Sequence, residues 1–164
     1  MRRASWHAWA VSGAVLCAHA AGVALRASDG GMDNAIVVRA ARTWLDGGSP
    51  YADRHFLHLP SAVLAAAPQT LLPAYALRVP VPLTVTALLV TGWACALSVH
   101  GVPWRSRLAV LGPAGLALGF APFGHLVSLG NWTVTAAAAL PLALLLAARD
   151  RWGWAERSSA RPSP

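Results

Sequence analysis

The sequence predicts an all-α membrane protein with about four transmembrane helices and one long outer loop. Hydrophobic residues make up 56% of the 164-residue chain, and charged residues make up only 12%. Soluble domains carry about 25% charged residues, so half that value favours a chain that lies in lipid. The third observation is the position of the charges, which fall between long apolar stretches. Residues 4–25, 59–77, 79–99 and 108–148 contain no Asp, Glu or Arg.

The lengths of these stretches predict the number of membrane crossings. One crossing takes about 20 helical residues, because a helix rises 1.5 Å per residue and the hydrocarbon core is about 30 Å thick. Residues 4–25 and 79–99 each fit one crossing, and 108–148 is long enough for two, with a turn at the polar segment 124–131. Residues 59–77 contain prolines, which interrupt helical hydrogen bonding. We therefore expect a short helix and a re-entrant or interfacial piece there instead of a span.

The arrangement of the basic residues predicts the orientation. All basic side chains are arginines, and the formal net charge is +7. They lie in ones and twos at the edges of apolar stretches, which is typical of topology-setting charges and argues against nucleic-acid binding. Four spans then place both termini in the cytoplasm. We expect a plasma-membrane protein with a transmembrane domain at 1–150, an outer loop at 27–78 and a disordered cytoplasmic tail at 151–164.

Two alternatives at the start of the chain and at the cysteines remain open. Arg2 and Arg3, an apolar run and the triplet 18–20 also resemble a signal peptide with a cleavage site. Cys17 and Cys95 lie inside apolar stretches and favour buried thiols, although a disulfide between them is compatible with the sequence. No cysteine or histidine spacing indicates a metal site, and no cofactor is expected.

The outer loop is predicted to begin with a helix at residues 33–46. Asp33 is suited to be its N-cap, and Gly47 follows the last apolar position, where a C-cap glycine is expected. Apolar residues recur at helical spacing and form one stripe, while Arg39 and Arg42 fall on the other side. The stripe consists of Ile36, Val37, Ala40, Ala41, Trp44 and Leu45. We expect this helix to lie along the membrane surface or against the bundle.

Two interpretations of the polar residues in this loop remain open. A carboxylate beside arginines at a membrane face is suited to act as a general base toward a lipid-phosphate substrate, since arginine matches phosphate oxygens bidentately. A plain N-cap at Asp33, with arginines that anchor to lipid headgroups, would give the same sequence. His55 and His58 favour interfacial polar residues over metal ligands. His125 fits a functional polar group within the membrane and a wetted interfacial residue equally well.

Residues 32–73, "MDNAIVVRAARTWLDGGSPYADRHFLHLPSAVLAAAPQTLLP", resemble the first outer loop of the bacterial polyprenyl-phosphate-sugar-dependent glycosyltransferases of family 87. These are mannosyl- and arabinofuranosyltransferases of cell-envelope assembly. In that family an Asp opens a helix, a Gly-rich turn precedes Pro-Tyr, and a Pro-containing apolar piece ends at Leu-Pro. The later segment "LGNWTVTAAAALPLALLLAARDRW" is similar to a family turn that precedes an apolar helix, with Asn131 and Thr133 at its Gln and Asn positions. Val38 and His58 depart from the pattern, which has Tyr at both positions.

The resemblance implies part of a GT-C fold in which the first outer loop holds the catalytic Asp. It implies inverting transfer of a sugar from a polyprenyl-phosphate donor, with Asp33 activating the acceptor hydroxyl and Asp29 in reserve. The implied substrate-binding residues are Arg39, Arg42, Arg54, Tyr51 and His58, with the arginines near the donor phosphate. Family members have many more spans, so the chain is expected to be an N-terminal portion. The alternative is a small non-enzymatic integral membrane protein that assembles with a membrane-protein partner.

Overall fold

Helices form the whole framework of the part of the chain that the structure describes. The computed structural model describes the backbone of residues 2–27 and 29–159 and, within these ranges, the side chains up to residue 149. The regular elements in these ranges are helical, and the only extended pairing there is an isolated antiparallel bridge between Arg3 and Ser106. The predicted all-α class is therefore confirmed.

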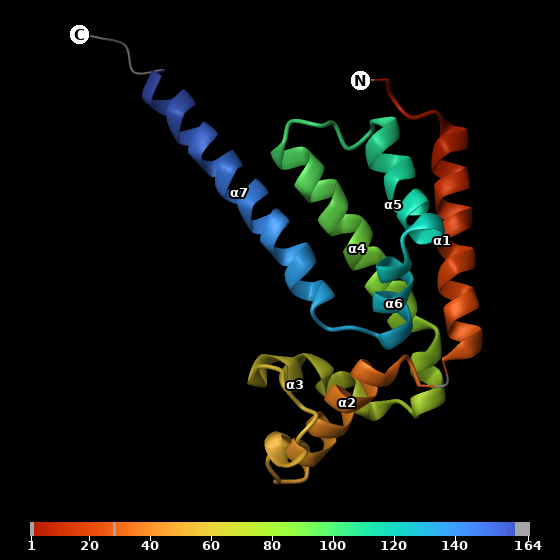
Figure 1. Ribbon diagram of the computed structural model, residues 1–164. Coiled ribbons are helices and arrows are strands. Elements are labelled where there is room, and N and C mark those ends of the chain that lie inside the picture. Colours follow the sequence, from red (N-terminus) through yellow and green to blue (C-terminus); the bar gives the residue numbers. More distant parts are fainter. Residues whose placement is uncertain (1, 28, 160–164) are drawn as a thin grey trace.

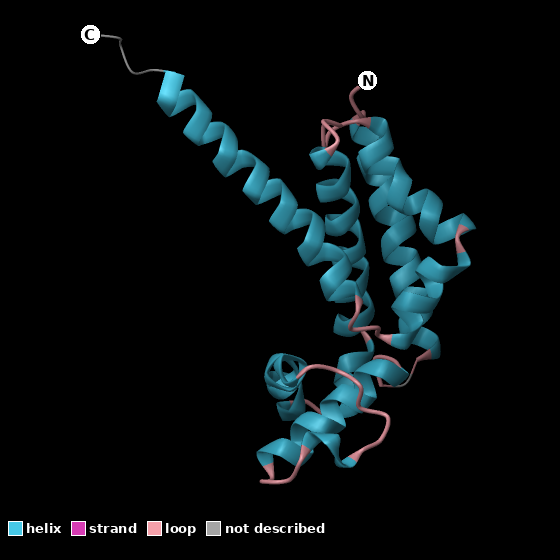
Figure 2. Ribbon diagram, turned by 60° about the vertical axis from the view of Figure 1, so that its left-hand side comes forward, coloured by secondary structure: helices cyan, strands magenta, loops and turns pink. Residues whose placement is uncertain are grey.

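The helices form a bundle with a smaller helical cap at one end (Figure 1). The bundle consists of α1 (Trp6–Arg26), α4 (Pro80–Val99), α5 (Arg107–Gly119), α6 (Ala121–Leu129) and α7 (Val134–Ser159). The cap consists of α2 (Met32–Leu45), η1 (Pro50–Ala52), α3 (Pro60–Ala66), η2 (Ala67–Leu71) and η3 (Ala74–Arg78). Both views place the α4–α5 turn and the chain start at the end opposite the cap (Figure 2).

Two elements are long and apolar enough to cross a membrane. They are Trp6–Arg26, which matches the predicted crossing at 4–25, and Ala74–Val99, which contains the predicted crossing at 79–99 but begins earlier, inside the stretch 59–77. Helices α5 and α6 are long and apolar enough to cross a membrane only if they are taken together, and the chain bends by 83° between them. Pro122 lies in the first turn of α6 and cannot donate a backbone hydrogen bond into the preceding helix, which accounts for the break at Phe120. The apolar part of α7, Val134–Arg149, is shorter than a full crossing.

The turn within residues 108–148 lies at the end of the predicted segment 124–131. Helix α6 continues through Leu129, and the chain reverses at Gly130, which adopts the left-handed conformation with φ +62°. Residues 59–77 form a short helix followed by two 3-10 turns, so the predicted short helix is confirmed, while residues 74–77 belong to the segment Ala74–Val99 that is long enough to cross a membrane. Helix α7 runs to Ser159 and includes part of the predicted tail, while residues 160–164 lie outside the described residues.

The hydrophobic core joins the cap to the bundle. Val37, Ala40 and Ala41 of the predicted stripe are buried on α2, Ile36 is half-buried, and Val38, which lies outside the stripe, is also buried. Trp44 and Leu45 are exposed, because the helix projects beyond its neighbours at that end. The remaining core is supplied by buried residues of the cap and of the adjoining helix ends: Phe56, Val63, Ala66, Leu77, Val81, Val85, Phe123, Val127 and Val134.

Candidate functional site

The first turn of α2 holds Asp33, the predicted catalytic residue. The prediction that Asp33 is the N-cap is wrong: the helix begins at Met32 and its N-cap is Gly31. Gly31 adopts φ +103°, a conformation that glycine tolerates and other residues resist. Asp33 therefore lies inside the helix, and its Oδ2 accepts a hydrogen bond from Asn131 Nδ2 at 2.7 Å. The carboxylate is directed toward the α6–α7 turn and is partly buried.

A second side-chain pair reinforces this junction. Asn34 is 1% exposed, and its Oδ1 accepts a hydrogen bond from Trp132 Nε1 at 3.1 Å. Asn131 Oδ1 in turn accepts the backbone N–H of Thr133 at 2.9 Å and also the Thr133 hydroxyl. The two pairs, Asp33–Asn131 and Asn34–Trp132, each join residues 98 positions apart. Side chains from the α6–α7 turn thus hold the first turn of α2 in place.

Glycines allow the two backbones to meet at this junction. A Cβ atom on Gly31 would overlap the backbone carbonyl of Leu129, and one on Gly130 would overlap the carbonyl of Gly30. Any side chain at these positions would push the α1–α2 connection away from the α6–α7 turn. The close approach places Asp33 within reach of Asn131.

An open hollow of about 750 Å³ lies on one side of the junction. Its polar lining comes from α1, from the α1–α2 connection and from α6: His19, Arg26, Asp29, His125 and Ser128. Met32 and Ala35, which lie on the same helix as Asp33, also line it, whereas Asp33 does not. The Nε2 atom of His19 is buried and has no hydrogen-bond partner among the described residues. The hollow therefore combines an arginine and two imidazoles with an apolar wall.

A smaller cavity of about 240 Å³ lies on the other side, between the cap and α4. Asn34, Gln69 and Asn131 contribute its amide groups, and Leu72, Leu77, Val81, Val85 and Leu88 are among its apolar residues. Within the described part of the chain, Asn34 Nδ2 and Gln69 Oε1 are buried without a hydrogen-bond partner. Buried polar groups in native structures are normally paired with protein or water. The lining therefore suits a molecule, or water, with both donor and acceptor groups.

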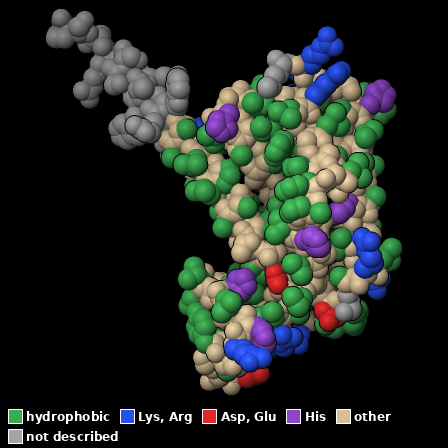
Figure 3. Space-filling model, in the orientation of Figure 1, with side chains coloured by type: hydrophobic (Ala, Val, Ile, Leu, Met, Phe, Trp, Pro, Cys, Tyr) green, Lys and Arg blue, Asp and Glu red, His purple; other side chains and the backbone are tan. Residues whose placement is uncertain are grey.

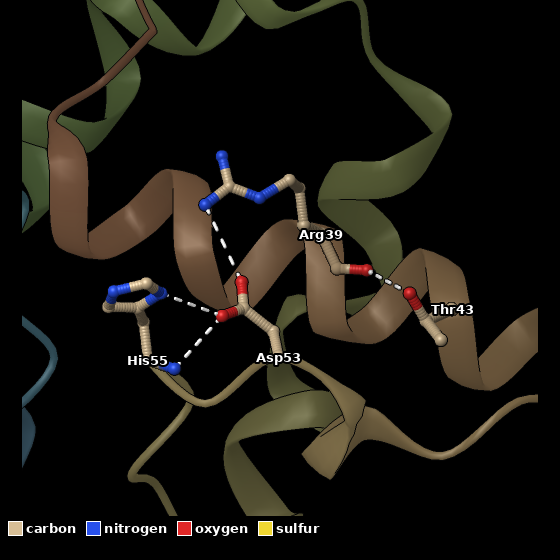
Figure 4. Close-up of polar contacts among 4 residues, drawn as sticks. All are labelled: Arg39, Thr43, Asp53 and His55. Carbon is tan, nitrogen blue, oxygen red and sulfur yellow. Dashed lines mark hydrogen bonds and ion pairs between the residues drawn. The ribbon is translucent and has the colours of Figure 1, made fainter.

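A separate polar cluster lies further along the cap (Figure 4). Asp53 Oδ1 accepts the backbone N–H of His55 at 2.9 Å and lies 2.9 Å from His55 Nδ1, while Asp53 Oδ2 lies 3.7 Å from Arg39 Nη2. The hydrogen bond from the His55 backbone, followed by the one from its ring, lowers the pKa of the Asp53 carboxyl. The hydroxyl of Thr43 donates to the Arg39 carbonyl at 3.1 Å within α2. The Arg39 guanidinium is thus directed toward the Asp53 carboxylate, while the Arg39 carbonyl binds Thr43.

The other predicted substrate-binding residues also make contacts away from Asp33. Arg42 Nη2 donates to the Leu72 carbonyl at 3.4 Å. The Tyr51 hydroxyl donates to the His58 carbonyl at 3.3 Å, and Arg54 is exposed.

Helix geometry keeps Arg39 and Arg42 away from the Asp33 carboxylate. Arg39 lies six residues beyond Asp33, about 9 Å along the helix axis, and Arg42 lies on the opposite side of the helix. The structure brings Asp33 together with Asn131 and does not bring Arg39 or Arg42 to it.

The partners of Asp33 were only partly visible in the sequence. Asn131 stood in the family-like turn, yet nothing in its spacing paired it with a residue 98 positions earlier. Arg26 lies at the edge of the apolar stretch 4–25, where the sequence predicts a topology-setting charge, and His19 lies inside that stretch. No group of three or more His, Cys, Asp or Glu within the described residues is arranged to hold a metal ion.

Comparison with known proteins gave no matching family model, no similar curated protein and no similar solved structure. The motifs quoted above and the geometry of the junction are therefore the basis for a functional proposal.

Proposed function

We propose that the chain is the N-terminal portion of a multi-pass plasma-membrane glycosyltransferase. The complete enzyme transfers a hexose or pentose from a polyprenyl-phosphate donor to an envelope glycolipid or glycan. The observation that carries this proposal is the hydrogen bond between Asp33 and Asn131, which holds a carboxylate beside a residue that lines the smaller cavity, at one end of an apolar bundle. This bond also joins two segments that separately resemble family motifs.

The membrane placement is part of the proposal. In this proposal helix α1 and the segment Ala74–Val99 are two crossings, and the broken pair α5–α6 is the third. Helix α7 is assigned as the fourth, although its apolar part is shorter than the other crossings. The arginines at the chain start and in the α4–α5 turn lie at the end opposite the cap, and basic residues favour the cytoplasmic side. The cap, and Asp33 with it, then lies at the outer face. Hydrophobic side chains cover much of the bundle surface between these ends (Figure 3).

The larger hollow is suited to the donor phosphate. The Arg26 guanidinium offers several N–H donors, and each histidine offers at least one ring N–H. Arg39 and Arg42 already contact Asp53 and Leu72, so the phosphate is assigned to Arg26 instead of to these arginines. The apolar lining beside Arg26, including Val23 and Leu129, suits the start of a prenyl chain.

The smaller cavity is suited to the acceptor, because its amide groups can bind hydroxyls. The acceptor oxygen attacks the anomeric carbon, and the bond from that carbon to the phosphate oxygen breaks. The electron pair leaves with the polyprenyl phosphate, and the hydroxyl proton passes to Asp33. Attack from the face opposite the leaving group inverts the configuration. Asn131 holds one oxygen of the carboxylate, and the other accepts the proton.

The experiment compares two carboxylates of the same helix. Bacterial membranes that contain the complete enzyme, of which this chain is the N-terminal portion, receive a radiolabelled polyprenyl-phosphate sugar, and transfer into the lipid and glycan fractions is measured. Replacing Asp33 with Asn removes the base, and we expect transfer to fall by about a hundredfold or more. Asp46→Asn makes the same chemical change at the exposed C-cap and should leave transfer intact. Equal transfer by both variants, or no transfer by the unaltered complete enzyme, contradicts the proposal.

Helix α7 supports a second candidate, a partner subunit without catalytic activity. Its exposed leucines, Leu140, Leu142, Leu144 and Leu146, form an apolar surface, and α7 packs mainly on α4. In Figure 1 its distal half diverges from the bundle. Such a surface fits lipid or the helix of another membrane protein. Stoichiometric co-purification with a second membrane protein, together with absence of sugar transfer, would favour this candidate over the enzyme.

A further inference from the structure

The end of the bundle opposite the cap is tied together by backbone hydrogen bonds. The N–H of Ala4 donates to the Arg105 carbonyl at 2.7 Å, and the N–H of Arg107 donates to the Arg2 carbonyl at 3.2 Å. Arg3 and Ser106 form the antiparallel bridge between these bonds. The segment before α1 is therefore held against the α4–α5 turn, although about one hundred residues separate the two in sequence.

This pairing collects four arginines at one place. Arg2, Arg3, Arg105 and Arg107 are all exposed. The four carboxylates with described side chains lie on the α1–α2 connection or in the cap: Asp29, Asp33, Asp46 and Asp53. The ion pairs between side chains up to residue 149 all involve Asp53. We call this end of the bundle, with Arg2, Arg3, Arg105 and Arg107, the arginine end. Its positive charge is concentrated, and none of the four described carboxylates forms an ion pair with it.

Tryptophans form a wall beside these arginines. Trp9 and Trp104 meet edge to face with ring centroids 6.0 Å apart, and Arg105 Cζ lies 4.5 Å from the centroid of the Trp104 ring. A hollow of about 410 Å³ lies here, lined by Arg3, Ala4, Trp6, Trp9, Trp104 and Arg105. Trp6, Trp9 and Trp104 are 72%, 46% and 54% exposed, which is unusual for such large apolar groups in water.

The position of this hollow relative to the apolar helices indicates its surroundings. It lies where α1 begins at Trp6 and close to where α4 ends at Val99. Tryptophan is enriched at the membrane–water interface, where its ring meets lipid headgroups. Arginine binds phosphate oxygens through two parallel N–H groups. An interfacial hollow with both residue types combines an apolar wall with phosphate donors.

We propose that this arginine–tryptophan hollow, formed by Arg3, Trp6, Trp9, Trp104 and Arg105, binds the phosphate of an anionic glycerophospholipid in the leaflet that this end faces. The guanidinium groups of Arg3 and Arg105 contact the phosphate, and the tryptophan rings border the glycerol region. The proposal rests on the membrane placement given above and does not depend on glycosyl transfer. The site lies at the opposite end of the bundle from Asp33, so its ligand is separate from the sugar donor.

Native mass spectrometry of the detergent-purified chain tests this site by titration with phosphatidylglycerol and, separately, with phosphatidylcholine. The unaltered chain should bind phosphatidylglycerol more tightly. Replacing Arg3 and Arg105 together with Gln should weaken that binding roughly thirtyfold, at about fivefold per arginine. The matched control, Arg42→Gln with Arg54→Gln, removes the same charge from the cap and should leave the affinity within about twofold.

A third variant keeps the test decisive if the double arginine variant does not fold. Trp104→Leu leaves the backbone bonds in place but removes the ring beneath Arg105, and it should weaken phosphatidylglycerol binding about two- to fivefold. Equal affinity of the two double arginine variants, or of Trp104→Leu and the unaltered chain, overturns the proposal. Displacement of the lipid by inorganic phosphate would assign the site to free phosphate instead. A chain that does not sediment with membranes would overturn the membrane placement itself.

Discussion

The two ends of the bundle are both held together by contacts between distant segments, but the contacts differ in kind. At the arginine end, backbone groups of residues 2–4 pair with those of 105–107, and the charged side chains point outward. At the cap end, side chains make the connection through Asp33–Asn131 and Asn34–Trp132. The first arrangement leaves its side chains available to a charged surface. The second uses its side chains to orient one another.

The two ends are therefore suited to different tasks: the arginine end to attraction toward a charged surface, and the cap end to holding one side chain in a fixed position. Exposed arginines interact with a charged surface through long, adaptable side chains, so small displacements matter little there. A general base must lie within hydrogen-bonding distance of the proton it accepts, so its position must be held. At the junction, two side-chain pairs and three closely packed glycines hold the position of Asp33, the base in the proposed function.

The largest expected effect comes from adding one methyl group at the junction. Gly31→Ala combines a φ of +103° with overlap against the Leu129 backbone, and we expect a loss of roughly 3 kcal/mol or more in the free energy of unfolding. Chemical denaturation of the chain in detergent, followed by circular dichroism, measures the change. Gly47→Ala is the matched control, because Gly47 has φ +83° but open space around its Cβ position.

The control distinguishes overlap from backbone strain. Gly47→Ala should cost only about 1–2 kcal/mol, which is the price of the left-handed conformation alone. If the two substitutions lower the free energy of unfolding equally, the close approach of the backbones at Gly31 does not contribute to stability. The cap end would then be held no more tightly than an ordinary turn.

A smaller effect is expected at Asp53, in the cap but outside the junction. Hydrogen bonds from His55 lower the pKa of its carboxyl in the folded chain. A lowered folded pKa stabilises the fold above the ordinary carboxyl pKa, and this contribution is lost as the pH falls through the lowered value. Asp53→Asn should therefore reduce the thermal midpoint slightly at neutral pH, and the difference from the unaltered chain should vanish in strong acid.

A titration of the thermal midpoint with pH, repeated for Asp46→Asn, isolates this contribution. Asp46 is exposed at the C-cap of α2, so its replacement makes the same charge change without the His55 contacts. A difference between unaltered chain and Asp53→Asn that stays constant across the acid range would show that His55 does not favour the charged carboxylate.

The sequence predicted those elements whose cause is local. Apolar length indicated α1 and α4, prolines indicated the broken segment 59–77, and Gly47 follows the end of α2 directly after the C-cap Asp46. Gly47 N–H donates to Trp44 and Gly48 N–H donates to Thr43, which is the glycine-terminated helix end that the pattern predicts.

The site was less predictable because it depends on contacts between distant segments. Asp33 was expected to cap its own helix, yet Gly31 takes that position and leaves the carboxylate for Asn131. The bend at Phe120 also escaped prediction, although Pro122 marks it in the sequence. The close contact between Gly31 and Leu129 requires the three-dimensional arrangement of α1, α2 and α6, which no local pattern encodes.

The central claim is that the two ends of the bundle lie on opposite sides of a membrane. Cysteine labelling with a membrane-impermeant maleimide tests it, in a chain whose Cys17 and Cys95 are replaced by alanine. Ser49→Cys places the thiol in the cap and Ser5→Cys places it at the arginine end, and both positions are exposed. In intact cells the reagent should label Ser49→Cys and not Ser5→Cys, with the reverse in inverted membrane vesicles. Labelling of both positions from the same side would contradict the claim.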